Sequence, residues 1–269
     1  MDNRPIGFFD SGIGGLTCIP HFRRLLPKES IVYFGDTART PYGSKSLENI
    51  RKFSFQISDY LAGHDVKMIV IACNTISATC LDALRRRHPE LPIIGIIDPI
   101  AEKLAGKEYS GVEVGVIGTK VTISSGAYAN MVADKNKYVK MFSIACPAFV
   151  PLIEEGIINN EIMDLTIKYY LDDFIEQNRI KKLVLGCTHY PIIKEEIHRL
   201  YPELGLLNPS EEVVNKIIRV LGERDAFAEE KMFVDKCYAS DLSPGLYKMV
   251  DRVFEGSDSV KVDIKKFED

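Results

Sequence analysis

Several features that mark other protein classes are missing from this chain of 269 residues. It has no tryptophan, no CxxC pair, no Cys/His spacing typical of zinc sites, and no apolar run long enough to span a membrane. Basic residues are not in excess, since 34 lysines and arginines stand against 38 aspartates and glutamates, for a net charge of −4. These absences argue against a metal-stabilised domain, a membrane partner and a general nucleic-acid binder.

The one dense basic run, residues 85–88, has a local explanation. It follows a stretch with the apolar spacing of a helix and precedes Pro89. Cations are favourable at the carboxyl end of a helix, because they offset its dipole. We therefore expect this run to end a helix rather than to bind a polyanion.

The cysteines are few and scattered. The amino terminus enters a short apolar strand without the apolar segment of a signal peptide, so we expect a cytoplasmic protein with reduced thiols. The six cysteines are Cys18, Cys73, Cys80, Cys146, Cys187 and Cys237. Free cysteine often packs as a small buried residue, and we expect this of all except Cys73 and Cys187.

Short apolar runs alternate with amphipathic stretches, which is the pattern of parallel strands joined by helices. Most of these runs are apolar throughout and do not alternate with polar residues, as expected for strands buried on both faces. The predicted strands are 6–9, 31–34, 68–72, 93–97, 114–117, 139–144, 183–185 and 232–234. The sequence therefore predicts an α/β fold with two similar lobes and mainly parallel central sheets.

The expected domain boundaries follow from the order of these strands. The first four end near Asp98 and Pro99, and a second series runs to about Leu207. A strong helix after Pro209, with Ser210 as its expected N-cap and Gly222 just beyond its end, leads to the last predicted strand. We expect a discontinuous first domain, residues 1–98 plus 208–269, and an inserted second domain, residues 99–207.

Cys73 and Cys187 lie in two similar segments. Residues 69–75 read IVIACNT and residues 183–189 read LVLGCTH, each a buried strand, a small residue, a cysteine and then polar side chains. Ligands of open α/β sheets bind outside the carboxyl ends of the strands, where both sulfurs are expected. A following helix would lower the pKa of each thiol toward neutrality. Such groups are efficient proton donors and acceptors.

The polar residues beside the cysteines support this interpretation. Asn74, Thr75, Thr188 and His189 are costly to bury unless they are hydrogen-bonded, and a ligand crevice gives a reason for them. His189, two residues after Cys187, could control the charge of that thiol or protonate a substrate group.

Two loops at strand ends supply further polar groups. Residues 9–17, FDSGIGGLT, resemble a dinucleotide fingerprint but carry Thr17 where its last glycine belongs, and Asp10 would repel phosphate. Asp10 and Ser11 are better suited to an ammonium group or a hydroxyl. Residues 35–44, GDTARTPYGS, form a second polar, turn-rich loop. Together the loops suit a zwitterionic ligand.

Four separated segments, residues 10–15, 36–44, 72–75 and 186–191, resemble the signature segments of the glutamate racemases, in the aspartate/glutamate racemase superfamily. The resemblance spans about the first 220 residues. It implies a cofactor-independent homodimer that interconverts L- and D-glutamate and supplies D-glutamate for peptidoglycan synthesis. It also places Cys73 and Cys187 on opposite faces of the substrate α-carbon, in the cleft between the lobes.

The resemblance implies a role for each matching residue. The catalytic residues would be Cys73, Cys187, Asp10, His189, Asp36 and, from the segment 149–156, Glu155 in preference to Glu154. The substrate contacts would be Asp10, Ser11, Pro41, Tyr42, Gly43, Ser44, Asn74, Thr75, Thr119, Thr188 and His189. No metal ligand is implied. The sequence after about Leu221 matches no specific segment and is expected to complete the first domain.

Three other functions are compatible with these residues. The first is a racemase for aspartate or another acidic amino acid, because side-chain selectivity depends on pocket shape. The second is a thiol hydrolase that uses Cys187 with His189, in which Cys73 would have no essential part. The third is an amino-acid-binding protein without catalytic activity.

Overall fold

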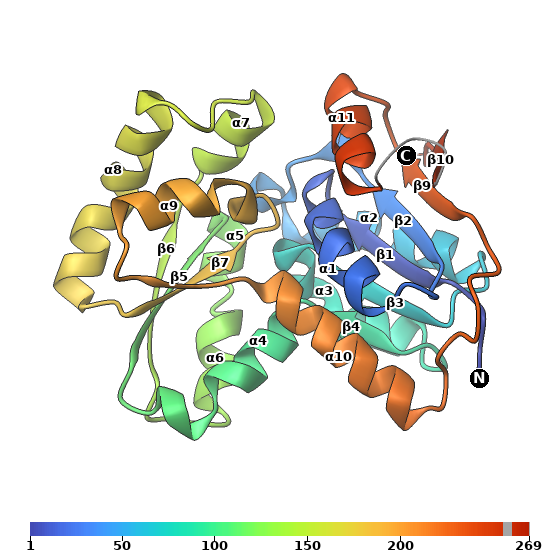
Figure 1. The fold of residues 1–269 in the computed structure, drawn as a ribbon, viewed down its shortest axis with the longest axis horizontal. Coiled ribbons are helices and arrows are strands. Elements are labelled where there is room, and N and C mark those ends of the chain that lie inside the picture. Colours follow the sequence, from blue (N-terminus) through green and yellow to red (C-terminus); the bar gives the residue numbers. More distant parts are fainter. Residues whose placement is uncertain (255–259, 269) are drawn as a thin grey trace.

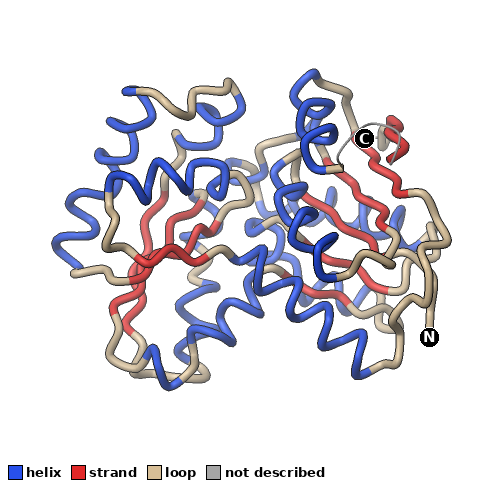
Figure 2. Tube along the Cα trace, viewed as in Figure 1, coloured by secondary structure: helices blue, strands red, loops and turns tan. Residues whose placement is uncertain are grey.

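The computed structural model describes residues 1–254 and 260–268, which form two α/β lobes lying side by side (Figure 1). The first sheet has the strand order β10-β9-β2-β1-β3-β4 and the second has the order β6-β5-β7-β8. Helices lie on either side of the strands in both lobes (Figure 2). The prediction of two similar lobes with parallel sheets is therefore confirmed.

The strands of the first sheet are β1 (Ile6–Asp10), β2 (Ile31–Gly35), β3 (Met68–Ile71), β4 (Ile93–Gly95), β9 (Asp235–Ala239) and β10 (Val260–Ile264). Those of the second are β5 (Glu113–Gly118), β6 (Lys140–Ala145), β7 (Lys182–Gly186) and β8 (Gly205–Leu207). The α-helices are α1 (Ile19–Leu25), α2 (Leu47–Ala62), α3 (Asn74–Arg87), α4 (Ile97–Leu104), α5 (Lys120–Ser124), α6 (Ala127–Ala133), α7 (Phe149–Glu154), α8 (Glu161–Asn178), α9 (Lys194–Leu200), α10 (Pro209–Glu223) and α11 (Pro244–Val253). Short 3-10 helices are η1 (Gly14–Cys18), η2 (Thr37–Arg39), η3 (Tyr42–Ser44), η4 (Lys107–Tyr109) and η5 (Tyr190–Ile193).

The strands of each sheet run parallel, so their carboxyl ends share one edge. In the first sheet, Phe9 of β1 lies beside Phe34 of β2 and Ile71 of β3. In the second, Ile117 of β5 lies beside Leu185 of β7. The loops that carry the predicted site residues therefore emerge together, those after β1, β2 and β3 from one sheet and those after β5 and β7 from the other.

Most predicted strands are confirmed, with small changes at their ends. The predicted strand 93–97 stops at Gly95, because Ile97 begins α4. The predicted strand 232–234 is wrong, since these residues are about half exposed and the strand begins at Asp235 instead. β8 and β10 were not predicted. The strand β9 pairs with β2, so the chain returns to the first sheet as expected.

The distribution of strands fits the expected domain division without testing its boundaries, which remain a prediction. The first sheet takes strands from residues 6–95 and 235–264, and the second takes them from residues 113–207. Between these ranges, α4 packs against α10 and α6.

The ends of three helices test local predictions. α2 has Ser46 as its N-cap, and α3 ends at Arg87, within the basic run that was expected to end a helix. α10 begins earlier than predicted, because Asn208 is its N-cap and accepts a hydrogen bond from the Ser210 N–H at 3.1 Å. Gly222 lies inside this helix rather than beyond it.

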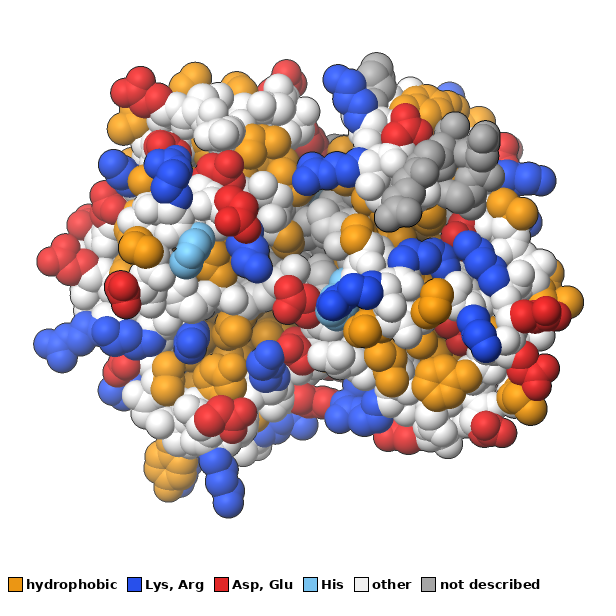
Figure 3. Space-filling view, viewed as in Figure 1, with side chains coloured by type: hydrophobic (Ala, Val, Ile, Leu, Met, Phe, Trp, Pro, Cys, Tyr) orange, Lys and Arg blue, Asp and Glu red, His pale blue; other side chains and the backbone are white. Residues whose placement is uncertain are grey.

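The surface shows no large segregation of charge on the face in view. Lys and Arg side chains are interspersed with Asp and Glu over both lobes in Figure 3. Within residues 1–254 and 260–268, none of the helices combines the length and the apolar character that crossing a bilayer requires.

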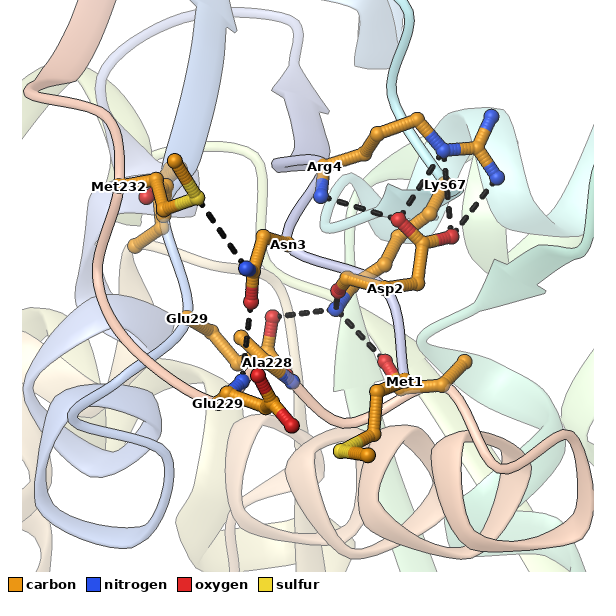
Figure 4. A network of polar contacts seen from close by, with 12 residues as sticks. Met1, Asp2, Asn3, Arg4, Glu29, Lys67, Ala228, Glu229 and Met232 are labelled. Carbon is orange, nitrogen blue, oxygen red and sulfur yellow. Dashed lines mark hydrogen bonds and ion pairs between the residues drawn. The ribbon is translucent and has the colours of Figure 1, made fainter.

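A buried polar network at the amino edge of the first sheet holds the returning chain (Figure 4). Lys67, just before β3, forms an ion pair of 2.6 Å with Glu29, and both side chains are almost fully buried. The Lys67 Nζ also donates to the carbonyl oxygens of Asp2 at 2.6 Å and Ala226 at 2.7 Å. Glu29 Oε1 accepts from the Ala228 N–H at 2.9 Å. The amino terminus and the segment after α10 are thereby fixed to the first lobe.

Candidate active site

Cys73 lies at the carboxyl edge of the first sheet, as the N-cap residue of α3. Its side chain is buried, and its Sγ lies 3.5 Å from the Ser11 Oγ. Burial, reinforced by the nearby Asp10 carboxylate, raises the pKa of the Cys73 thiol to about 12. The Ile76 N–H in the first turn of α3 does lower this pKa, but burial outweighs it, so the predicted shift toward neutrality is wrong. Cys73 is a protonated thiol at neutral pH, the form in which it can donate a proton.

Cys187 occupies the corresponding edge of the second sheet and has a different environment. It follows β7 and precedes η5, a 3-10 helix of four residues that has Pro191 in its first turn and continues directly into α9 at Lys194. The Cys187 Sγ lies 3.8 Å from Nδ1 of His189. The other ring nitrogen of His189, Nε2, lies 3.1 Å from Oε1 of Glu154.

His189 is held as a cation by its partners. Burial by itself lowers the pKa of the imidazole, but the hydrogen bonds to Cys187 and Glu154 and the charge of Asp10 outweigh burial and raise it to about 10. At neutral pH both ring nitrogens are then donors, one toward sulfur and one toward carboxylate. A cation beside Cys187 stabilises negative charge on that sulfur.

The carboxylate that contacts His189 belongs to Glu154, whereas the sequence favoured Glu155. Glu154 is the last residue of α7, and its side chain is about one-third exposed, at 32%. Glu155 follows the helix end and is exposed. The carboxylate placed against His189 is therefore that of Glu154 and not that of Glu155.

Asp10 links the two lobes at the end of β1. It is fully buried, and its oxygens accept hydrogen bonds from the Gly12 N–H at 3.1 Å and from the Thr188 hydroxyl at 3.4 Å. Burial raises the pKa of the Asp10 carboxyl, although the charge of His189 opposes the shift. Gly14 belongs to the same contact, since a Cβ there would lie 2.4 Å from the Thr188 Oγ1. Only glycine lets the first loop approach the second lobe this closely.

A second link between the lobes begins at the residue after Cys73. The Tyr128 hydroxyl, on α6 of the second lobe, donates to Asn74 Oδ1 at 2.6 Å. The Asn74 Nδ2 is buried and has no hydrogen-bond partner within the described part of the chain. Thr75 Oγ1 lies 3.0 Å from Thr119 Oγ1 and 3.2 Å from Thr122 Oγ1. The predicted contacts Asn74, Thr75 and Thr119 are thus brought together, with an unused amide donor among them.

The loop after β2 contributes one wall of the site. Tyr42 is buried, and its hydroxyl donates to Asp36. Gly43 abuts the second lobe, where a Cβ would lie 2.5 Å from the Thr119 Cβ. Pro41 and Ser44 are exposed, so the structure does not bring these two predicted contacts together with the buried site residues.

Asp36 supports this loop. The carboxylate is fully buried and accepts hydrogen bonds from Arg39, Tyr42 and Ser240. With its oxygens engaged in this way, Asp36 is better suited to positioning Tyr42 than to the predicted catalytic role.

Sequence reasoning missed the groups that orient the site. Tyr128, Thr122 and Ser240 follow no recognisable motif, and the partners Asn74, Thr75 and Asp36 lie far from them in the sequence. In the described ranges, 1–254 and 260–268, His, Cys, Asp and Glu side chains form no group of three or more able to hold a metal ion.

The sequence and fold match known proteins closely. Residues 17–217 match the family described as Asp/Glu/Hydantoin racemase. The chain is 43% identical over 239 residues to a glutamate racemase of Sulfurihydrogenibium, covering 88% of this chain and 91% of the relative. It is 40% identical over 253 residues to a glutamate racemase of Persephonella marina, covering 94% of each.

A solved structure gives the same result over nearly the whole chain. The glutamate racemase of Francisella tularensis, in complex with D-glutamate, has 37% sequence identity and a TM-score of 0.91, and the match covers 99% of this chain and 98% of that one. The chain therefore belongs to the Asp/Glu/Hydantoin racemase family and, within it, to the glutamate racemases.

Proposed function

We propose that this glutamate racemase moves the α-proton of glutamate between two thiols, Cys73 and Cys187. The observation that carries the proposal is the convergence of two strand ends. Cys73 follows β3 and Cys187 follows β7, and the contacts Thr188–Asp10 and Tyr128–Asn74 join the two edges. A substrate between the edges would have one sulfur on each side.

In each direction one cysteine acts as a thiolate and the other as a thiol. The thiolate takes the α-proton, and the electron pair of the broken C–H bond stays on carbon, delocalised into the carboxylate group. The opposite thiol then delivers its proton to the other face of this planar carbanion and becomes the thiolate. The configuration is inverted and no redox change occurs, so the chemistry needs no cofactor.

The other site residues suit the charges of glutamate. Asp10 and Ser11 are placed for the ammonium group, whose positive charge would offset the Asp10 carboxylate that disfavours a thiolate on Cys73. The unpartnered Asn74 Nδ2, fixed by Tyr128, is a donor for a carboxylate oxygen. His189 stabilises negative charge on Cys187, and Glu154 holds His189.

Family membership supports a proposal for the wider context. We propose that the D-glutamate supplies peptidoglycan synthesis, and that the protein works in the cytoplasm as a homodimer. Neither nucleic acid nor a membrane is part of this function.

Circular dichroism of L-glutamate incubated with the purified protein, without added cofactor, tests the proposal. The signal should fall to zero, and a start from D-glutamate should reach the same end point. Cys73→Ala and Cys187→Ala should each slow both directions at least about 100-fold, whereas Cys237→Ala, a buried cysteine outside the site, should keep the wild-type rate.

The alternatives give different results. A Cys187–His189 hydrolase would not racemise glutamate, and its activity would survive Cys73→Ala. An aspartate racemase would act faster on L-aspartate than on L-glutamate. If the folded wild-type protein leaves the optical activity of glutamate unchanged, the proposed function is wrong.

A further inference from the structure

The last residues of the chain pack beside the loop that follows β2, although no sequence motif covers them. After β10, the Lys265 N–H donates to the carbonyl oxygen of Ala239 at 2.8 Å and keeps the chain against the first sheet. Phe267 then lies against Phe34 and Tyr60, with ring centroids 5.3 Å and 6.0 Å apart. The tail is thus anchored by aromatic contacts on the first lobe.

Phe267 also forms one side of an aromatic enclosure for Arg39. The guanidinium carbon lies 4.0 Å from the ring centroid of Phe53 and 5.3 Å from that of Phe267. The Arg39 Nη1 donates to Gln56 Oε1 at 2.7 Å, and Nε donates to Asp36 Oδ2 at 2.7 Å. Aromatic faces attract a guanidinium and restrict its orientation. Phe267 therefore helps to aim Arg39 at Asp36.

A second contact from the carboxyl-terminal part reaches the same carboxylate. Ser240, directly after β9, donates its hydroxyl to Asp36 Oδ1 at 2.7 Å. The same oxygen of Ser240 accepts from the Ala38 N–H at 2.9 Å. Asp36 in turn accepts the hydroxyl of Tyr42. Ser240 and Phe267 thus approach the loop from two separate points in the last 30 residues.

The loop 36–44 is connected to the neighbourhood of Cys73 by contacts through Thr119 of the second lobe. Gly43 packs against Thr119, which lies 3.0 Å from Thr75, two residues after Cys73. We propose that the carboxyl-terminal segment is a positioning element of the racemase site, in which Phe267 and Ser240 hold the loop 36–44 against Thr119. The inference rests on the proposed racemase function and assigns a role to residues beyond the family motifs.

Steady-state kinetics in both directions test this role. Phe267→Leu keeps an apolar side chain but removes the aromatic face from Arg39, so the loop should be less well placed for substrate. The KM for L- and D-glutamate should rise roughly threefold to thirtyfold, while kcat stays within about twofold. Ser240→Ala should raise KM in the same way. Phe267→Tyr, which keeps an aromatic face toward Arg39, should have the wild-type KM.

Phe233→Leu is the matched control. Phe233 is also an aromatic residue of the carboxyl-terminal part, but it is about half exposed. It lies before β9, at the amino end of this strand, whereas the loop 36–44 follows the carboxyl end of β2. The proposal is overturned if Phe267→Leu and Ser240→Ala both keep the wild-type KM, or if Phe233→Leu raises KM equally. An inactive wild-type protein would instead overturn the racemase function itself.

Discussion

His189 has a charge state that depends on its two neighbours. Because the hydrogen bonds to Cys187 and Glu154 outweigh burial, the pKa of His189 is raised to about 10, and the ring is charged over the whole neutral range. A raised pKa in the folded state adds stability that is complete below the unfolded value of about 6.5 and is lost as pH rises through about 10. The cation beside Cys187 is lost over the same alkaline range.

Glu154→Gln should therefore move the alkaline limit of activity. The amide cannot stabilise the imidazolium as a carboxylate does, so the pKa of His189 falls. The alkaline limb of kcat/KM should shift to lower pH, and kcat/KM at neutral pH should fall about tenfold to a hundredfold. The pH dependence of kcat/KM for L-glutamate measures both effects.

Glu155→Gln is the comparison for this substitution. It makes the same chemical change one residue later, at the exposed position that the sequence favoured. Glu155→Gln should leave the alkaline limb of kcat/KM at its wild-type pH. A shift caused by Glu155→Gln but not by Glu154→Gln would restore the original assignment.

For single residues, the sequence predicted the placement of the two cysteines at strand ends better than it predicted the side chains that contact them. Cys73 and Cys187 were predictable, because each follows an apolar run and precedes polar residues that only a ligand site would explain. Glu154 and Glu155 could not be separated, since the last turn of α7 decides which side chain reaches His189. Tyr128 was not predictable, because its partner Asn74 lies in the other lobe.

Among the secondary-structure elements, apolar runs predicted the central strands and failed at the sheet margins. β8 has only three residues, and β10 carries Lys261 and Asp263, so neither forms a clear apolar run. β9 begins at Asp235, a buried carboxylate that Arg23 and Lys231 neutralise. Those partners lie outside the strand, so strand propensity could not predict them.

The ion pair of Lys67 and Glu29 should dominate the stability of the returning chain. Lys67→Met leaves the Glu29 carboxylate buried without its charge partner and should lower the free energy of unfolding by about 3–5 kcal/mol. The double variant Lys67→Met/Glu29→Gln should recover part of this loss. Urea denaturation at neutral pH measures both.

Lys103→Met gives the reference for an exposed pair. Lys103 pairs with Glu212 at 2.5 Å, but its side chain is 40% exposed, so its loss should cost about 1 kcal/mol or less. Equal destabilisation by Lys67→Met and Lys103→Met would show that the buried network does not fix the returning chain.

The whole molecule has two similar lobes whose sites differ in detail. Each lobe presents a cysteine after a central strand of its sheet, which matches a reaction that needs a base on both sides of one carbon. The environments are unequal, however. Cys73 caps a helix of 14 residues beside Ser11 and Asp10, whereas Cys187 lies beside the His189 cation and a short 3-10 helix. The sequence predicted the symmetry, and the structure shows how the two thiols differ.

Deuterium incorporation during racemisation in D₂O tests the two-thiol arrangement most directly. Starting from L-glutamate, proton removal on one face and delivery on the other should place solvent deuterium at the α-carbon of D-glutamate from the first turnover. The remaining L-glutamate should stay largely protiated early in the reaction. A carbanion that returns to L-glutamate is protonated by the cysteine that has just removed the proton, and this cysteine still carries that proton. The reverse pattern should hold from D-glutamate. Deuterium that appears equally in both enantiomers from the start, or product that keeps the substrate proton, would contradict a mechanism with Cys73 and Cys187 on opposite faces.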